Sequence, residues 1–296
     1  QLPLNLFLNA TPIQGIDYLE VPEKSDPFLD LAISDTRADS VHMGINLPQS
    51  YTGKDVIVGI VDWGFEYANP VFFDTSLTTH RVLASWDQVR TSGNPPVGFN
   101  HGTLLDNTVD LLNMEVDTFS TSSTYHGTHV AGIAGGAGAG TAYRGVGFES
   151  DLLFSQMKSG YANSSLDAYQ WMYQTASALG KRLVINNSFG SMRTNPLDGT
   201  SLFSQAIESY IDSGVVFVVS GGNSSGVNHH IRRDFNNDSI KTRIGGFGYA
   251  NDTLLWGQTI STWGEQGNNY SCRIRILSGN SVLLKQTPLF NTLTTA

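Results

Sequence analysis

A run of small and β-branched residues at positions 56–61 constrains the fold of this chain more than any other feature. It reads Val-Ile-Val-Gly-Ile-Val and lacks the alternation of apolar and polar residues that marks a strand with one solvated face. A continuous apolar run of this length is typical of a strand buried on both faces, as in parallel sheets covered by helices. The chain is therefore expected to fold around a buried parallel sheet.

The segments that follow alternate between strand and helix patterns. Further buried strands are expected at three places, namely 151–157, 183–186 and 215–219. Apolar residues at helical spacing fill the intervals at about 164–179 and 203–211, and Gly180 and Gly214 stand where these helices would end. This order predicts an α/β fold, a parallel sheet with helices on both faces.

A further helix is expected to begin at His126. The residues behind it are mostly Ala and Gly, a composition that suits a helix buried on all sides, where neighbouring backbones come close. By contrast, residues 66–124 are rich in Thr, Asn, Pro and Gly, and they are predicted to be irregular insertions outside the core.

The chain divides into three predicted parts: 1–33, 34–239 and 240–296. The first contains short strand-like alternations and a polar linker, and the second is the α/β domain. In the third, Ile274 and Ile276 alternate with arginines before Gly279-Asn280, which predicts an antiparallel hairpin. We expect this part to be the start of an all-β unit.

Composition excludes several classes of protein. The formal net charge of −9 argues against nucleic acid or an anionic membrane surface as partner. No apolar run is long enough to span a bilayer. The single cysteine, Cys272, excludes an internal disulfide framework and a multi-thiolate metal site. Because the sequence opens on Gln1, we expect an upstream segment to have been removed.

Polar residues follow three of the expected strands: Asp62, Asn187-Ser188 and Asn223. The carboxyl ends of parallel strands share one edge of a sheet, where ligands bind, and the helix at His126 is expected to begin there too. An aspartate, a histidine and an amide at one edge are parts of an acyl-transfer site. The carboxylate orients the imidazole, the imidazole takes and returns a proton, and the amide supports the developing oxyanion.

Four segments resemble the subtilisin-like serine proteases, or subtilases, in the order in which that family has them. They are Val58–Gly64, His126–Gly132, Ile185–Gly190 and Gly222–Gly226. The resemblance implies that Asp62 is the triad carboxylate, His126 the base and Asn223 the oxyanion donor. It also implies that Ser188-Phe189-Gly190 pairs with the substrate backbone, and that His129 is a structural residue of the helix.

The same resemblance extends to the ends of the chain and to its surroundings. Residues 1–33 would be a propeptide remnant with a linker, and residues 240–296 an incomplete β insertion of the kind some bacterial members carry. The implied activity is that of a serine endopeptidase acting on a protein or peptide substrate, with the chain's own propeptide as another partner. No cofactor is required, although structural calcium is expected without assigned ligands. Secretion or display on a bacterial surface is implied.

The sequence departs from the family pattern in three ways. Trp63 replaces the usual small Ser or Thr, with a side chain large enough to crowd the rim of the site. The separation between Asp62 and His126 exceeds that in compact members. The Gly-Thr-Ser-Met-Ala segment that supplies the nucleophile does not occur, and neither Ser191 nor Ser281 stands where it belongs. We therefore expect the nucleophile beyond residue 296, and little or no peptidase activity from this chain alone.

The sequence leaves three alternatives open. A catalytically inactive subtilase-like binding protein would keep these motifs without the serine. A nucleotide-binding fold is suggested by the glycines in 135–140, but this run follows a helix and does not fit G-x-G-x-x-G. A metal hydrolase is suggested by His126 with His129, or by His229-His230. However, the first pair is three residues apart without the glutamate that a metalloprotease helix needs.

Overall fold

The computed structural model describes a main body of the chain and several shorter segments near its C-terminal end. The described residues are 32–120, 125–158, 162–190, 198–223, 231, 234, 239–242, 262–264, 267–278 and 281–292. Internal contacts divide the chain into two compact units, Gln1–Thr52 and Gly53–Ala296. In the first unit, the described residues contain two short helices that the sequence did not predict, α2 (Ala32–Asp35) and α3 (Ala38–His42). The strand-like alternations predicted before residue 32 lie outside the described residues.

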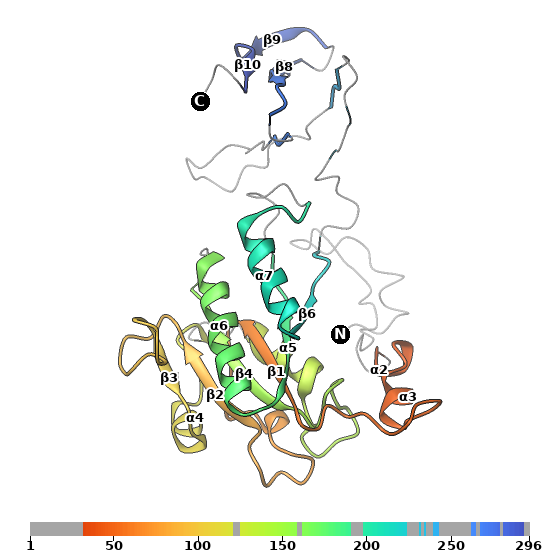
Figure 1. The fold of residues 1–296 in the computed structure, drawn as a ribbon, viewed down its shortest axis with the longest axis vertical. Helices are drawn as coiled ribbons and strands as arrows, with labels where there is room; N and C mark the ends of the chain where they lie inside the picture. The colour runs from red at the N-terminus through yellow and green to blue at the C-terminus, as the bar shows by residue number, and fades with distance from the viewer. Residues whose placement is uncertain are drawn as a thin grey trace, which may run out of the picture. The chain divides into compact units, whose positions relative to one another are not determined.

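The second unit is built on a six-stranded sheet with the order β3-β2-β4-β1-β5-β6 (Figure 1). Its strands are β1 (Val56–Asp62), β2 (Val82–Asp87), β3 (Thr103–Leu105), β4 (Asp151–Gln156), β5 (Arg182–Asn187) and β6 (Val216–Val219). All neighbouring strands run parallel except β3, which is antiparallel to β2. The predicted parallel sheet is confirmed, with the expected apolar run as one of its two central strands.

Helices cover both faces of this sheet. They are the 3₁₀ helix η1 (Pro70–Phe72), α4 (Thr108–Met114), α5 (His126–Gly135), α6 (Ala162–Ala178) and α7 (Leu202–Asp212). Successive side chains of a strand point to opposite faces. Ile57 and Val61 of β1 accordingly join the hydrophobic cluster beneath α6 and α7, which lie side by side in Figure 1. Val58 and Ile60 join the opposite cluster, which includes Ala131 of α5.

The prediction that residues 66–124 are irregular insertions was wrong, because they contain β2, β3 and α4. In β2, Trp86, Ser85 and Asp87 are fully buried. Ser85 donates a hydrogen bond to the Tyr67 hydroxyl (3.1 Å), and Asp87 accepts one from the backbone N–H of Thr118 (2.8 Å). Ser85 and Asp87 interrupt the apolar run by which a buried strand is recognised in the sequence. Their hydrogen-bonding groups are paired with residues that come close only in the folded chain.

The composition of α5 predicted a helix buried on all sides, and this prediction was wrong. His129 and Ile133 are exposed, with 40% of Ile133 accessible to solvent. The buried residues of α5 are Gly127, Thr128, Ala131 and Gly135. Its small residues therefore allow α5 to pack closely against β1 on one side of the helix only.

Near the C-terminal end, two antiparallel strand pairs agree with the predicted β-rich character. Strand β7 (Ser271–Cys272) pairs with β10 (Phe290–Asn291), and β8 (Arg275–Leu277) with β9 (Leu283–Gln286). The predicted turn at Gly279-Asn280 lies outside the described residues, and the domain boundaries at 33 and 239 stay predictions. Among the described residues, no helix is both long and apolar enough to cross a membrane.

Candidate active site

Asp62 and His126 form a hydrogen-bonded pair at the carboxyl end of β1. The Nδ1 atom of His126 lies 2.6 Å from Oδ1 of Asp62. The Asp62 side chain is fully buried, whereas 41% of the His126 side chain is exposed. With the carboxylate ionised, Nδ1 carries the proton and donates it to Asp62, so Nε2 is the nitrogen that can accept another. The buried Asp62 carboxylate therefore holds the imidazole so that its Nε2 nitrogen is available to a proton donor.

Burial dominates the electrostatics of the Asp62 carboxyl. Burial raises the pKa of the Asp62 carboxyl above its ordinary value, and the hydrogen bonds from His126 and the Trp63 N–H lower it in part. Repulsion from Asp117 also raises this pKa. Oδ2 of Asp62 has no hydrogen-bond partner among the described residues. The hydrogen bond from His126 therefore offsets part of the cost of burying this carboxylate.

The turn after β1 is fastened by its main chain to the first turn of α5. The N–H groups of Gly127 and Thr128 donate to the carbonyls of Trp63 (2.7 Å) and Gly64 (3.0 Å). The Thr128 hydroxyl donates to the same Gly64 carbonyl (3.0 Å) and accepts from the Glu66 N–H (2.7 Å). The segment that carries the acid is therefore bound directly to the helix that carries the base.

Asp117 is a second buried carboxylate that supports this turn. Its Oδ2 accepts from the Gly64 N–H (2.8 Å), and its Oδ1 accepts from the N–H (2.9 Å) and hydroxyl (2.6 Å) of Ser120. Burial raises its pKa, against the opposing effect of these hydrogen bonds. Sequence reasoning missed Asp117, because it lies in the region predicted as irregular. Its local signal is limited to an Asp-x-x-Ser turn pattern.

The Trp63 side chain packs flat against the imidazole. The indole and His126 rings are stacked, with centroids 5.3 Å apart and planes 16° from parallel. Phe119 meets the indole edge-on at 6.1 Å, and Phe189 lies tilted to it at 6.2 Å. Trp63, which is large enough to crowd the rim, forms one wall beside the His126 imidazole.

The predicted substrate-pairing segment leaves the sheet at the same edge as Asp62. Val61 of β1 pairs with Asn187, and Asn187 pairs with Val219 of β6, so these strand ends are level. Ser188 and Phe189 follow β5 directly, and Phe189 reaches the aromatic group around Trp63. Among the described residues, a Cβ placed on Gly190 would meet no atom within 4 Å.

Asn223 lies beyond the end of β6, and its side chain is exposed. It makes no hydrogen bond to another described residue. The structure thus brings Asp62 and His126 together and places Phe189 against the neighbouring Trp63, whereas Asn223 follows a strand that ends at the same sheet edge. The catalytic roles of Asp62, His126 and Asn223 stay predictions.

The other candidate residues gain no support as a metal or nucleophile site. His129 is exposed on α5, and in the described part of the chain no three His, Cys, Asp or Glu side chains cluster closely enough to bind a metal. Ser281 is exposed in the loop between β8 and β9, where it has a φ of 62°. Ser191, His229 and His230 lie outside the described residues.

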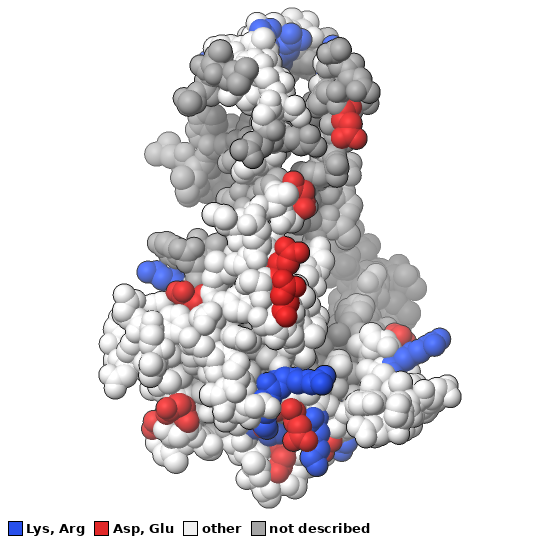
Figure 2. Space-filling view, in the orientation of Figure 1, with Lys and Arg blue, Asp and Glu red and all other residues white. Residues whose placement is uncertain are grey.

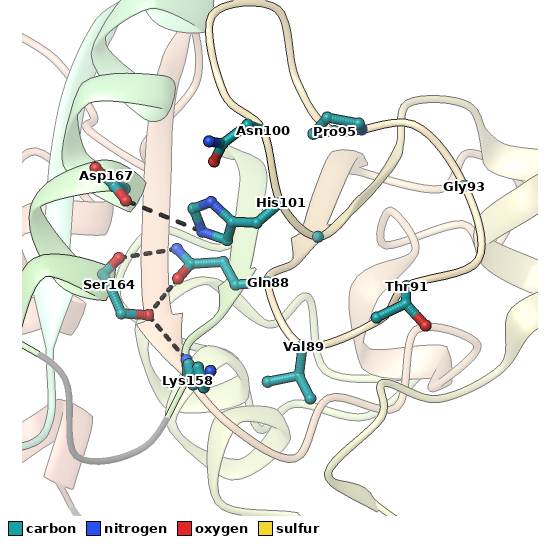
Figure 3. A pocket seen from close by; sticks show the side chains of 11 residues that line it. Gln88, Val89, Thr91, Gly93, Pro95, Asn100, His101, Lys158, Ser164 and Asp167 are labelled. Carbon is teal, nitrogen blue, oxygen red and sulfur yellow. Dashed lines mark hydrogen bonds and ion pairs between the residues drawn. The ribbon is translucent and has the colours of Figure 1, made fainter.

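A pocket of about 580 Å³ lies at the same sheet edge, beyond the ends of β2 and β4 (Figure 3). His101 and Asp167 face each other across it, with Nε2 and Oδ2 3.9 Å apart. Gln88 donates to the Ser164 carbonyl (2.8 Å) and also contacts the Ser164 hydroxyl. Neither Asp62 nor His126 is among the lining residues, so the pocket is separate from the acid–base pair.

A parallel α/β sheet with a buried aspartate bonded to a histidine at its carboxyl edge is the arrangement expected of the class identified from the sequence. The family model of the Subtilase family (Peptidase S8) matches residues 53–246, and the chain belongs to this family. The resemblance inferred from the four motifs is therefore confirmed.

Individual relatives support the same assignment over part of their length. The chain is similar to "Subtilisin" of Bacillus sp. (strain TA39), with 32% identity over 138 residues, covering 43% of this chain and 32% of that protein. It is also similar to "Subtilase-type proteinase RRT12" of Saccharomyces cerevisiae (strain ATCC 204508 / S288c), with 28% identity over 157 residues, or 52% and 30% of the two chains. Each match thus spans about a third of the curated relative.

A solved structure shares the fold. The CspB protease of Clostridium perfringens superposes with a TM-score of 0.52 at 23% identity, covering 65% of this chain and 40% of that one. This likeness shows the subtilisin-like α/β architecture.

Proposed function

We propose that the protein is a serine endopeptidase in which Asp62 and His126 are the acid and base of a catalytic triad. The observation that carries this proposal is the 2.6 Å contact between His126 Nδ1 and the buried Asp62, at the carboxyl edge of the sheet in a subtilase chain. The Gly-Thr-Ser nucleophile segment does not occur in the sequence. We therefore assign the nucleophile to a serine beyond residue 296.

In the proposed reaction, His126 Nε2 takes the serine proton as the serine oxygen bonds to the peptide carbonyl carbon. Asp62 stabilises the imidazolium that results. The proton then passes to the leaving nitrogen as the C–N bond breaks, and water releases the acyl group by the reverse sequence. Asn223 donates a hydrogen bond to the oxyanion, a contribution of about 3–4 kcal/mol to lowering the barrier in comparable sites.

The proposed substrate is a protein or peptide that binds in extended form beside Ser188-Phe189-Gly190. The open space at Gly190 leaves room for a backbone there, and Phe189 offers an apolar surface. The net charge of −9 does not favour nucleic acid. On the face drawn in Figure 2, the described lysines and arginines are interspersed with acidic residues and form no continuous basic patch.

Family membership also supports three accessory proposals. The mature protein would act outside a bacterial cell, its 1–33 segment would be the remnant of a propeptide that occupies the site, and calcium would be bound as a structural ion. A shift in thermal midpoint on adding calcium to protein treated with a chelator would support the last of these.

Covalent labelling with a fluorophosphonate tests the proposed function. The full-length protein should be labelled at a serine beyond residue 296, and the 296-residue chain alone should not. His126→Ala should abolish labelling, and Asp62→Asn should lower kcat by about 10⁴-fold because the imidazole loses its oriented tautomer. His129→Ala, an exposed position on the same helix, is the matched control and should react normally.

Two outcomes would contradict this proposal. Labelling of the full-length protein that survives His126→Ala would remove His126 from the base role. A folded full-length protein that is neither labelled nor active would favour the inactive subtilase-like binding protein instead.

A further inference from the structure

The backbone of Trp63 is fixed on both sides of the Asp62–His126 pair. Its N–H donates to Asp62 Oδ1 (2.8 Å), the oxygen that also contacts His126. Its carbonyl accepts from the N–H of Gly127, the residue after the histidine (2.7 Å). The indole therefore projects from a segment with little freedom to move relative to the pair.

The indole ring is also held by aromatic neighbours. Phe119 packs against it edge-on, with planes at 60°, and Phe189 is tilted at 48°. The indole also stacks on the His126 ring, with an angle of 16° between the two ring planes. The imidazole is thus constrained twice, by Asp62 at Nδ1 and by Trp63 across one face.

The two constraints respond differently to charge. The face of an indole carries negative π density and attracts a cation above it. A neutral imidazole gains less from this face than the imidazolium formed when His126 takes a proton. The acidic groups on the other sides are Asp62, bonded to the ring, and Asp117, which acts on Asp62 through repulsion. Both are held by hydrogen bonds that do not involve the indole ring.

We propose that Trp63 is a positioning residue for the base, with an indole face that fixes the His126 ring plane and favours its positively charged form. This inference rests on the proposed function, because it adds to the catalytic cycle only if His126 is the base. An interaction that is stronger once the proton has been transferred accelerates the reaction and does not merely tighten substrate binding. A side chain that only filled space would be replaceable by leucine.

Nuclear magnetic resonance of the 296-residue chain tests the positioning role without any need for activity. The ring current of a stacked indole should displace the His126 ring protons upfield. Trp63→Leu should abolish this displacement and lower the pH midpoint of the His126 ring titration by about half a pH unit. Trp63→Phe, which keeps an aromatic face, should retain most of both effects.

Trp171→Leu is the matched control, since Trp171 is a buried tryptophan of α6 in the cluster beneath that helix. It should destabilise the fold and leave the His126 resonances where they are. Unchanged His126 ring shifts in a folded Trp63→Leu variant would overturn the inference, whatever the activity of the protein.

Kinetics of the full-length protein test the catalytic consequence. Trp63→Leu should lower kcat by about 3- to 30-fold with little change in KM, and Trp63→Phe should restore most of the loss. The acidic limb of the kcat/KM profile should move to lower pH in Trp63→Leu, because the uncharged base becomes easier to form. An unchanged kcat and profile would remove the catalytic part of the inference. A full-length protein without peptidase activity would refute the proposed function, and the resonance experiment would still decide whether Trp63 positions the ring.

Discussion

Asp117 shows how much a single carboxylate outside the Asp62–His126 pair contributes to the site. It is 1% exposed, and its carboxylate accepts a hydrogen bond from the N–H of Gly64, in the turn that follows Asp62. Burying a charged group costs free energy unless hydrogen bonds compensate for it. Asp117 therefore stabilises the turn through its bonds while bearing a desolvation cost that depends on pH.

We predict that Asp117→Asn lowers the free energy of unfolding at neutral pH by about 1–3 kcal/mol, because a buried donor loses its charged acceptor. Since burial raises the pKa of Asp117, the native state binds this proton more tightly than the unfolded chain does. The part of its stabilisation that is linked to this proton is present below the ordinary value of 3.8 and is lost as pH rises through the raised pKa. The hydrogen bonds that Asp117 accepts from the Gly64 and Ser120 N–H groups persist above that pKa. Asp117→Asn should flatten that part of the pH dependence, as measured by urea unfolding at a series of pH values.

Asp106→Asn is the control for this experiment, since Asp106 is an exposed aspartate between β3 and α4. We expect it to change the free energy of unfolding by less than about 0.5 kcal/mol and to keep the wild-type pH dependence. An Asp117→Asn variant with an unaltered pH dependence would show that Asp117 does not titrate differently in the two states.

At the scale of residues, the sequence predicts the pair and not its surroundings. Asp62 and His126 were expected to meet because a strand end and a helix start fall at one sheet edge. The stacking of Trp63 depends on a side-chain direction set by Phe119 and Phe189, which come from distant segments. The hydrogen bond from Gly64 to Asp117 likewise joins residues 53 positions apart, and no local pattern specifies it.

At the scale of elements, the first turn of α5 lies unusually close to the segment after β1. A Cβ added to Gly127 would meet the Phe65 ring at 2.8 Å and the Trp63 carbonyl at 2.9 Å. One turn further on, a Cβ added to Gly132 would meet only the end of the Val71 side chain, at 4.0 Å. The two glycines of one helix thus have opposite steric environments.

We predict that Gly127→Ala destabilises the protein by about 1–3 kcal/mol, because the helix must move away from the turn. Gly132→Ala should be neutral or stabilise by up to about 1 kcal/mol, because alanine has the higher helix propensity and the space is free. Urea unfolding of both variants measures the difference. Equal effects of the two substitutions would show that the close contact at Gly127 does not hold in solution.

Element prediction succeeded where the apolar pattern is local and failed where burial is polar. Strands β1, β4, β5 and β6 were expected from their apolar runs, and the structure has all four. Strand β2 was missed because Ser85 and Asp87 are buried through bonds to distant partners. The exposed side of α5 was missed for a related reason, since small residues indicate a close approach without indicating on how many sides.

At the scale of the whole molecule, the sheet and both of its hydrophobic clusters draw their described members from residues after Thr52. The first cluster begins at Ile57 and the second at Val58. The unit from Gly53 onward should therefore contain its own core. At the far edge of the sheet, Val215 is 3% exposed and Phe217 packs against the cluster beneath α6, so one face of this segment belongs to that core. Val216, Val218 and Val219 are exposed, so the predicted buried strand at 215–219 has the expected position but was wrong in its burial.

We predict that a chain beginning at Gly53 keeps the α/β sheet, with the far-ultraviolet circular dichroism and His126 resonances of the parent. A chain ending at Ser213 loses Val215 and strand β6, and it should unfold at clearly lower urea concentration. The two truncations form a matched pair. Loss of folding on removal of residues 1–52 would show that these residues are required for the sheet to form or persist.

The Thr128 hydroxyl links the Gly64 carbonyl to the Glu66 N–H. Because Asp62 and His126 are attached to segments that share these main-chain bonds, they cannot be separated without unfolding the start of α5. In the proposed enzyme, regulation would therefore act on substrate entry or on the position of the serine, because the Asp62–His126 pair is already assembled.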